Sequence, residues 1–208
     1  GGETVRDFIF TSTGLDKAIL AYEDLSHKIA NAADDNLPTL LEHFDLAQET
    51  LDRLGYYDAD ARSEQLISGL NIGGVTLDRT VSTLSGGQKT KLALVRLLFQ
   101  APELLLLDEP TNFLDVEAAD WLMEFLESYK GALLIISHDL DLLDRSINKV
   151  LRLNEFTHKL EEYRGTYSNY LTVTGDALAL MERTKQQQER EISRLRKLLG
   201  DWIDTEPY

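Results

Sequence analysis

Two adjacent carboxylates, Asp108 and Glu109, follow a run of four leucines at residues 104–107. A short apolar run of this kind is typical of a buried strand, so the pair is expected at the mouth of a strand. In nucleotide hydrolases the first acid of such a pair holds Mg²⁺, usually through water, and the second polarises the attacking water. The alternative is a strand that ends in two solvated acids, and the pair taken alone favours that alternative.

A single histidine, His138, comes just after the next apolar run, residues 133–136. A neutral imidazole at this position can hydrogen-bond a γ-phosphate or the attacking water. A lone histidine at a strand end is more often an ordinary surface residue. Between the two runs, residues 111–115 taken alone are typical of a turn that leads into a helix capped by Asp115.

Two glycines in the segment 84–88, of sequence LSGGQ, stand immediately before an amphipathic helix that is expected to run to about Phe99. Glycines at the start of a helix leave the backbone N–H groups unobstructed, and the helix dipole favours an anion there. Ser85 adds a hydroxyl donor. The alternative is that Ser85 caps the helix and the glycines form a tight turn, and a short glycine-rich match alone favours it.

The first 80 residues are predicted to form helices separated by short breaks. Apolar residues at helical spacing predict helices over residues 15–30, about 40–54 and about 60–70. The residues expected to end or cap these helices are Gly55, Asp58 or Asp60, Gly73 and Gly74.

From residue 100 the pattern changes to apolar runs that alternate with a helix. Residues 104–107 and 133–136 are expected to be buried strands, with a helix over residues 116–129 between them. This alternation is typical of a parallel sheet in an α/β fold. Residues 150–153 and 159–163 can add a final hairpin.

A basic segment near the C-terminus contrasts with an acidic body. The 208 residues include 36 acidic and 21 basic side chains, a formal net charge of −15, but residues 181–199 hold six basic and three acidic ones. The segment belongs to one long helix expected over residues 167–199, interrupted only by Gly175. The acidic body is a poor binder of nucleic acid, which leaves this segment as the place for phosphate contacts. The plainer interpretation is a helical hairpin whose charges are solvated, and both are expected to hold, with an apolar stripe facing a partner helix and the arginines facing RNA.

Composition also excludes several classes of protein. The chain has no cysteine, so it has no disulfide scaffold, no thiolate metal site and no cysteine nucleophile. No apolar run approaches the ~20 residues that a membrane helix needs, and the first residues lack the pattern of a signal peptide. A soluble, cytoplasmic globular protein is therefore expected.

The motifs are most informative in combination. The segments 84–88, 108–112, 114–115 and 137–139 occur in this order and at close intervals. Together they resemble the second half of an ATP-binding-cassette (ABC) nucleotide-binding domain: signature motif, Walker B strand, D-loop and switch histidine. The DEPTN and His-Asp sequences further resemble the ABC-F subfamily, whose members carry two cassettes on one chain and act mostly on the ribosome. Phe113, where that subfamily usually has histidine, is a departure from its pattern.

This resemblance implies an α/β fold, namely a partial ABC-type P-loop ATPase domain followed by a long linker helix. The linker would make this the N-terminal of the two cassettes. A helical subdomain would span residues 1–83. The catalytic half of the ATPase core, which includes the signature motif and the second half of the RecA-like parallel sheet, would span residues 84–170. The start of the linker would span residues 171–208. The motif G-x-x-x-x-G-K-[ST] does not occur, so the half of the cassette that cradles phosphates is missing. The chain is therefore expected to be a fragment, a split protein or part of something longer.

The resemblance also implies roles for individual residues. Two cassettes close head to tail around two ATP molecules, and each ATP contacts the Walker motifs of one cassette and the signature loop of the other. Asp108 would then hold Mg²⁺ through water, while Glu109 and His138 would be the catalytic residues. The remaining cofactor-binding residues would be Ser85, Gly86, Gly87, Gln88 and Asp115.

Three functions are compatible with these patterns. The first is an ATPase module of an ABC-F translation factor or antibiotic-resistance protein, with ATP and Mg²⁺ as cofactors. Its partners would be a second cassette and the ribosome, through contacts of the linker helix with rRNA or tRNA. The second is the ATPase subunit of an ABC membrane transporter. The third is a non-catalytic binding module, because this chain alone lacks the groups that grip phosphates.

Overall fold

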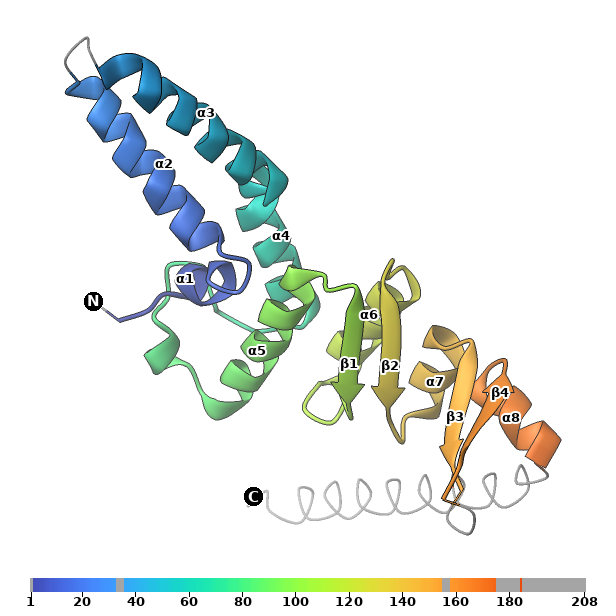
Figure 1. The fold of residues 1–208 in the computed structure, drawn as a ribbon. Coiled ribbons are helices and arrows are strands. Elements are labelled where there is room, and N and C mark those ends of the chain that lie inside the picture. The colour runs from blue at the N-terminus through green and yellow to red at the C-terminus, as the bar shows by residue number, and fades with distance from the viewer. Residues whose placement is uncertain (1, 33–35, 155–157, 175–183, 185–208) are drawn as a thin grey trace, which may run out of the picture. The chain divides into compact units, whose positions relative to one another are not determined.

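The structure is a computed structural model that describes residues 2–32, 36–154, 158–174 and 184. The chain divides into two compact units, Gly1–Asp139 and Leu140–Tyr208. The first unit holds a group of helices followed by two parallel strands, and the second holds two antiparallel strands with two helices (Figure 1). Except for residue 184, the basic segment 181–199 lies outside the described residues, as does most of the predicted linker helix.

Four helices open the first unit. They are α1 (Val5–Phe10), α2 (Leu15–Ala30), α3 (Leu37–Arg53) and α4 (Tyr56–Gly69). The three helices predicted from apolar spacing are present as α2, α3 and α4. Helices α2 and α3 lie side by side as a hairpin, in which the rings of Tyr22 and Phe44 are 4.6 Å apart (Figure 1).

The predicted start of α4 was wrong. The helix begins at Tyr56 and its N-terminal cap is Gly55, in the left-handed conformation with φ of 72°, which glycine adopts without steric cost. Neither Asp58 nor Asp60 caps it. Asp60 instead pairs with Arg6 of α1 at 3.0 Å, and together with Asp78 it raises the pKa of the Arg6 guanidinium.

A core of apolar side chains joins the helices of the first unit to one another. Helix α5 (Gly86–Gln100) follows a short 3₁₀ turn, Val81–Thr83, and helix α6 (Val116–Glu127) follows the first strand. The rings of Phe10 and Phe99 stack at 5.8 Å. The largest fully buried side chains of these helices are Ile9, Leu15, Leu92, Leu98, Phe99, Leu122 and Leu126.

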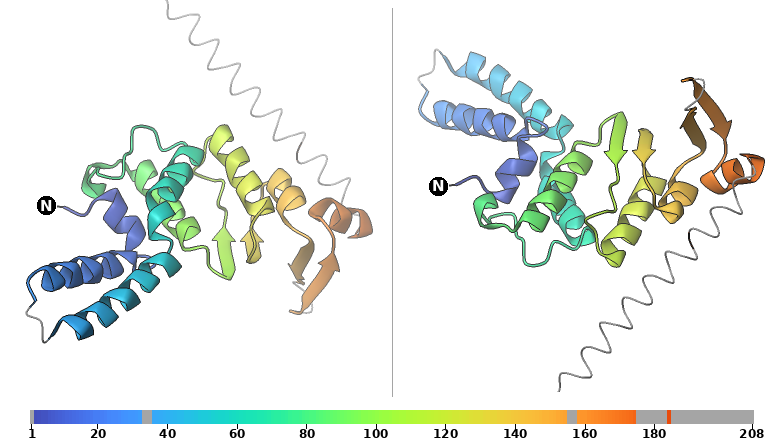
Figure 2. Two further views of the ribbon diagram at one scale, coloured as in Figure 1. Left: turned by 90° about the horizontal axis from the view of Figure 1, so that it is seen from above. Right: turned by 90° about the horizontal axis from the view of Figure 1, so that it is seen from below.

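Two parallel strands follow the helices, as predicted. Strand β1 (Leu104–Asp108) pairs with β2 (Ala132–Ile136) in a register that sets Asp108 opposite Ile136. The prediction that both strands are buried holds only in part: Leu105 and Leu107 of β1 are buried on one face, whereas Leu133 and Ile135 of β2 are half-buried. Helix α6 lies along one face of the pair (Figure 2). The residues of the other face are 46–62% exposed: Leu104, Leu106, Leu134 and Ile136.

The second unit contains the predicted hairpin, formed by β3 (Lys149–Leu153) and β4 (Leu160–Arg164). Helix α7 (Leu140–Ser146), which the sequence did not indicate, precedes it, and helix α8 (Tyr167–Thr174) follows it. The Asp144 carboxylate of α7 accepts hydrogen bonds from the N–H and the hydroxyl of Ser168, in the first turn of α8. These bonds satisfy helix-terminal donors and fasten the two helices together.

Replacing Gly69 tests the packing between α4 and α6. A Cβ at this position would lie 2.0 Å from Cε2 of Trp121. We therefore expect Gly69→Ala to lower the free energy of unfolding by about 1–3 kcal/mol through overpacking. Chemical denaturation measures this change. Gly73→Ala is the control, because a Cβ there meets no atom within 4 Å, and an equal loss in both variants would contradict the packing argument.

Candidate functional site

The strand register places the carboxylate pair beside the histidine. Beyond the last residue of β1, the N–H of Glu109 donates to the carbonyl of Ile136 at 2.8 Å. The next residues along both strands then meet. The backbone N–H of His138 donates to Oε2 of Glu109 at 3.3 Å, and its Nε2 lies 3.3 Å from Oε1. Both carboxylate oxygens of Glu109 are thus oriented by one residue.

The two side chains differ in how far solvent reaches them. The Glu109 side chain is 21% exposed and the His138 side chain is 98% exposed. Asp108, at the end of β1, is also exposed. The site therefore offers a sheltered carboxylate that water can still reach, next to an imidazole and a second carboxylate that are open to a molecule outside the chain.

The backbone at Glu109 is in the left-handed region, with φ of 47°. For a residue with a Cβ this conformation costs about 1–2 kcal/mol. The hydrogen bonds to Ile136 and from His138 hold the residue there. Strain that persists in this way is common at functional sites, where it fixes a side chain before the ligand arrives.

The glycine-rich segment forms the start of α5. Ser85 is its N-terminal cap: its hydroxyl accepts from the Gln88 N–H at 3.3 Å, and Gln88 Oε1 accepts from the Ser85 N–H at 3.0 Å. This is a capping box, so the helix-cap interpretation of Ser85 is confirmed. A Cβ on Gly86 or Gly87 would meet no atom within 4 Å. Both glycines are also exposed, so a molecule outside the chain can approach the start of α5, which is compatible with the predicted anion contact.

Asp115 is held by three partners within the first unit. Its Oδ1 accepts from the Ala118 N–H at 3.0 Å and caps α6, and its Oδ2 lies 2.7 Å from Nζ of Lys91. Asn71 donates to it at 3.4 Å. The hydrogen bond from Lys91, followed by that from Ala118, lowers the pKa of the Asp115 carboxyl to about 2. The cap predicted as the plain alternative is confirmed, and the nucleotide contact of Asp115 stays a prediction.

Lys91 is a residue that the sequence analysis missed. It lies on α5 six residues after Ser85, and its side chain is only 13% exposed. Besides Asp115, its ammonium donates to the carbonyls of Leu70, at 3.0 Å, and Asn71, at 3.4 Å. It thus joins the signature helix to the end of α4 and to the start of α6. The sequence pattern that could have indicated its burial is its four-residue spacing from Val95, which lies on the buried face of α5.

The comparisons with known proteins agree with this arrangement. A family model described as "ABC transporter" matches residues 10–112, about half of the chain. The chain belongs to the ABC transporter ATPase family. The match includes the signature segment and the Asp108–Glu109 pair of this ABC domain.

Several curated relatives resemble the ABC domain over most of its length. An ABC transporter ATP-binding protein, YfmM of Bacillus subtilis, is 35% identical over 85% of this chain and 34% of its own. The energy-dependent translational throttle protein EttA of Mycobacterium tuberculosis is 37% identical, over 77% of this chain and 28% of its own. The chain therefore spans about a quarter to a third of such relatives. A solved ATP-binding subunit of an ABC transporter gives a TM-score of 0.46 at 24% identity, covering 57% of this chain and 49% of that one.

The described residues could bind Mg²⁺ only together with ligands from a nucleotide and water. Among the described residues there is no group of three or more histidine, aspartate or glutamate side chains that could hold a metal ion. Asp108 offers one exposed carboxylate at a strand end. Mg²⁺ commonly binds through one or two carboxylates together with waters and substrate phosphates, so Asp108 fits an ion that arrives with a nucleotide.

Replacing Asp115 tests its ion pair through pH. The carboxyl pKa is about 2 in the folded chain and about 3.9 when unfolded, so its contribution to stability is complete above about pH 4 and is lost as the pH falls toward 2. We expect Asp115→Asn to destabilise the chain at pH 7, with a difference from wild type that shrinks as the pH falls through this window. Urea denaturation across the pH series measures it.

Asp120→Asn is the matched control, because Asp120 is an exposed aspartate on the same helix. It should change the free energy of unfolding little at any pH. If the free energies of unfolding of the wild type and of Asp115→Asn differ by the same amount from pH 7 to pH 2.5, the ion-pair assignment is contradicted.

Proposed function

We propose that the chain is the catalytic half of a cassette in an ABC-F ATPase that acts on the ribosome in the cytoplasm. ATP-driven closure of two cassettes would hold the protein in its ribosome-binding conformation, and hydrolysis would release the protein from the ribosome. The observation that carries the ATPase proposal is the contact of Glu109 with His138, next to Asp108, in an ABC domain. The similarity to EttA, a protein named as a translational throttle, supports the ribosomal part.

In this proposal Glu109 orients the attacking water and takes its proton, because its carboxylate is fixed by His138 and remains partly open to solvent. When nucleotide is bound, the exposed imidazole of His138 turns its N–H from Glu109 to the γ-phosphate and donates a hydrogen bond to it. Asp108 would hold Mg²⁺ through water, and that ion would neutralise charge on the phosphate oxygens.

The start of α5 would serve a different nucleotide. The hydroxyl of Ser85 and the amides of the exposed Gly86 and Gly87 are donors at the positive end of a helix dipole. In the proposed head-to-tail pair they contact ATP bound to the second cassette. Gln88 holds the start of α5 in place, since its side-chain amide donates to the carbonyl of Gly73 at 3.1 Å.

We further infer that a segment carrying the Walker A motif covers the open face of the β1–β2 pair. Four large apolar side chains on that face are 46–62% exposed, Leu104, Leu106, Leu134 and Ile136, and contiguous exposed apolar surface marks an interaction site. A segment packed there would bring phosphate-binding groups to the strand ends that carry Asp108 and Glu109. The 208-residue chain alone is therefore expected to hydrolyse ATP at a negligible rate.

The transporter interpretation is the second candidate, since the relative YfmM is named as an ABC transporter ATP-binding protein. None of the helices in the described part of the chain has the length and apolar composition needed to span a bilayer. A transporter subunit would bind a separate membrane protein. Fractionation of the complete protein with ribosomes or with membranes distinguishes the two candidates.

The decisive variant for the ATPase proposal is Glu109→Gln in the complete protein. The amide keeps the size of the side chain but cannot accept a proton from water, so hydrolysis should fall by about 10²–10⁴ while ATP binding is retained. The ATP-bound form should then accumulate on ribosomes in sedimentation assays. Glu103→Gln, an exposed acid just before β1, is the control. Normal turnover of Glu109→Gln would remove Glu109 from this role, and accumulation on membranes instead would favour the transporter.

The basic segment 181–199 gives a separate test of the ribosomal part. Replacing Arg190, Arg194, Arg196 and Lys197 with glutamine should weaken ribosome association. It should also flatten the slope of log affinity against log salt by about 0.7–0.9 for each phosphate group that is no longer neutralised. Binding across a salt series measures both. A Lys17→Gln, Lys159→Gln variant should keep the original slope. Identical slopes in all variants would mean that this segment makes no contact with RNA.

A further inference from the structure

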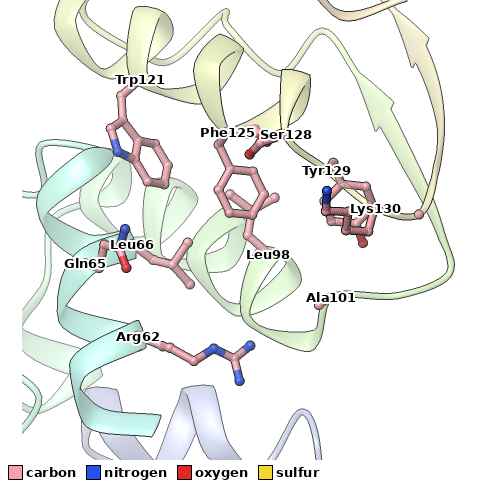
Figure 3. A pocket seen from close by; sticks show the side chains of 11 residues that line it. Arg62, Gln65, Leu66, Leu98, Ala101, Trp121, Phe125, Ser128, Tyr129 and Lys130 are labelled. Carbon is pink, nitrogen blue, oxygen red and sulfur yellow. The ribbon is translucent and has the colours of Figure 1, made fainter. Parts of the chain in front are cut away.

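A pocket of about 290 Å³ lies at the end of the strands opposite to Asp108 and Glu109. Ala101, Lys130 and Gly131, which precede β1 and β2, form one side of it. Helices α4 and α6 form the other walls, and the end of α5 closes the floor (Figure 3). The pocket therefore shares no residue with the candidate ATPase site.

One wall of the pocket is an aromatic ladder on α6 and the residues after it. Trp121, Phe125 and Tyr129 follow one another at four-residue spacing, with ring centroids 5.5 Å and 6.0 Å apart. Trp121 packs directly on Gly69, and the Tyr129 hydroxyl donates to the carbonyl of Pro102. Both ends of the ladder are thus held in place, so the wall exists before any ligand binds.

The floor of the pocket is aliphatic. Leu66 is 6% exposed and Leu98 is 2% exposed, and Phe125 projects toward both of them in Figure 3. A cavity of this volume admits one bulky apolar side chain rather than a whole helix. Burial of such a side chain against aliphatic and aromatic groups is the usual source of affinity in small pockets.

The charge of the pocket is opposite to that of the chain. Arg62 and Lys130 are the ionisable cations that line it, and none of its lining residues is a carboxylate, although the chain has 36 acidic and 21 basic residues. Arg62 is held over the Phe99 ring at 4.8 Å and donates through Nη2 to the Phe99 carbonyl at 3.0 Å. One N–H is engaged in this way, which leaves others of the fork for an anion.

We propose that this pocket binds an acidic peptide segment of a partner protein through one bulky apolar side chain. The apolar side chain enters between Leu66, Leu98 and the aromatic ladder, and flanking carboxylates pair with Arg62 and Lys130. A peptide fits better than RNA, because the aliphatic and aromatic lining of the pocket suits an apolar side chain, and its two cations match the few carboxylates of a short peptide rather than the continuous charge of a phosphate backbone.

The test uses the fluorescence of Trp121 in the 208-residue chain. Trp202→Phe removes the second of the two tryptophans, and the probe is the capped tetrapeptide Asp-Glu-Phe-Asp. We expect a saturable fluorescence change that weakens with salt. Arg62→Gln and Lys130→Gln should each weaken binding about two- to fivefold, as for partly exposed ion pairs. Lys17→Gln, a change to an exposed lysine of α2, should leave binding unchanged.

Several outcomes would overturn the proposal. They are the absence of binding at millimolar peptide, equal binding of the neutral peptide Asn-Gln-Phe-Asn, and equal affinity of Lys130→Gln. Tighter binding of oligouridine than of the peptide would assign the pocket to RNA. Self-association in sedimentation that Lys130→Gln abolishes would assign it to a second copy of the chain. Lys130 is exposed, so its variant tests the proposal even if Arg62→Gln fails to fold.

Discussion

The parallel pairing of β1 with β2 in one register is the constraint on which the candidate site depends. Successive side chains of a strand point to opposite faces, so a slip of one residue would turn the buried Leu105 and Leu107 toward solvent. The burial of these leucines therefore fixes the register. The register in turn sets Asp108 opposite Ile136 and brings Glu109 within 3.3 Å of His138. The chemistry at the strand ends is thus positioned by hydrophobic packing in the middle of the strands.

A second constraint joins this strand end to the glycine-rich helix. An ammonium group that is largely removed from solvent must find acceptors, because burying an unsatisfied charge is costly. Lys91 meets this need with Asp115 and with the carbonyls of Leu70 and Asn71. The three segments cannot move independently without breaking these bonds. In the proposed ATPase, a displacement of α5 by nucleotide at Ser85 would therefore be transmitted to the loop that follows Glu109.

The open face of β1–β2 and the pocket beside Trp121 suit different kinds of binding partner. The open face of β1–β2 is largely apolar and ends in the exposed Asp108, which suits a segment that completes the sheet layer. The pocket beside Trp121 is already formed, and its cations stand out in an acidic chain. The first surface belongs to the proposed assembly of a whole cassette, and the second offers a binding site that does not require nucleotide. The length of the curated relatives, of which the chain spans 23–34%, leaves room for such an assembly.

The sequence by itself determined the elements with strong periodicity, the parallel pairing, and the ABC motifs, because these depend on local spacing and on order along the chain. The tertiary structure decided which polar groups meet. Asp60 lies inside α4, which begins at Tyr56, and its carboxylate pairs with Arg6, 54 residues away. Lys91 joins the ends of α4 and α6 to α5, and is not a solvated charge, because folding brings the Leu70 carbonyl and the Asp115 carboxylate to its ammonium group. Partners distant in sequence are set by packing, and packing leaves no local pattern.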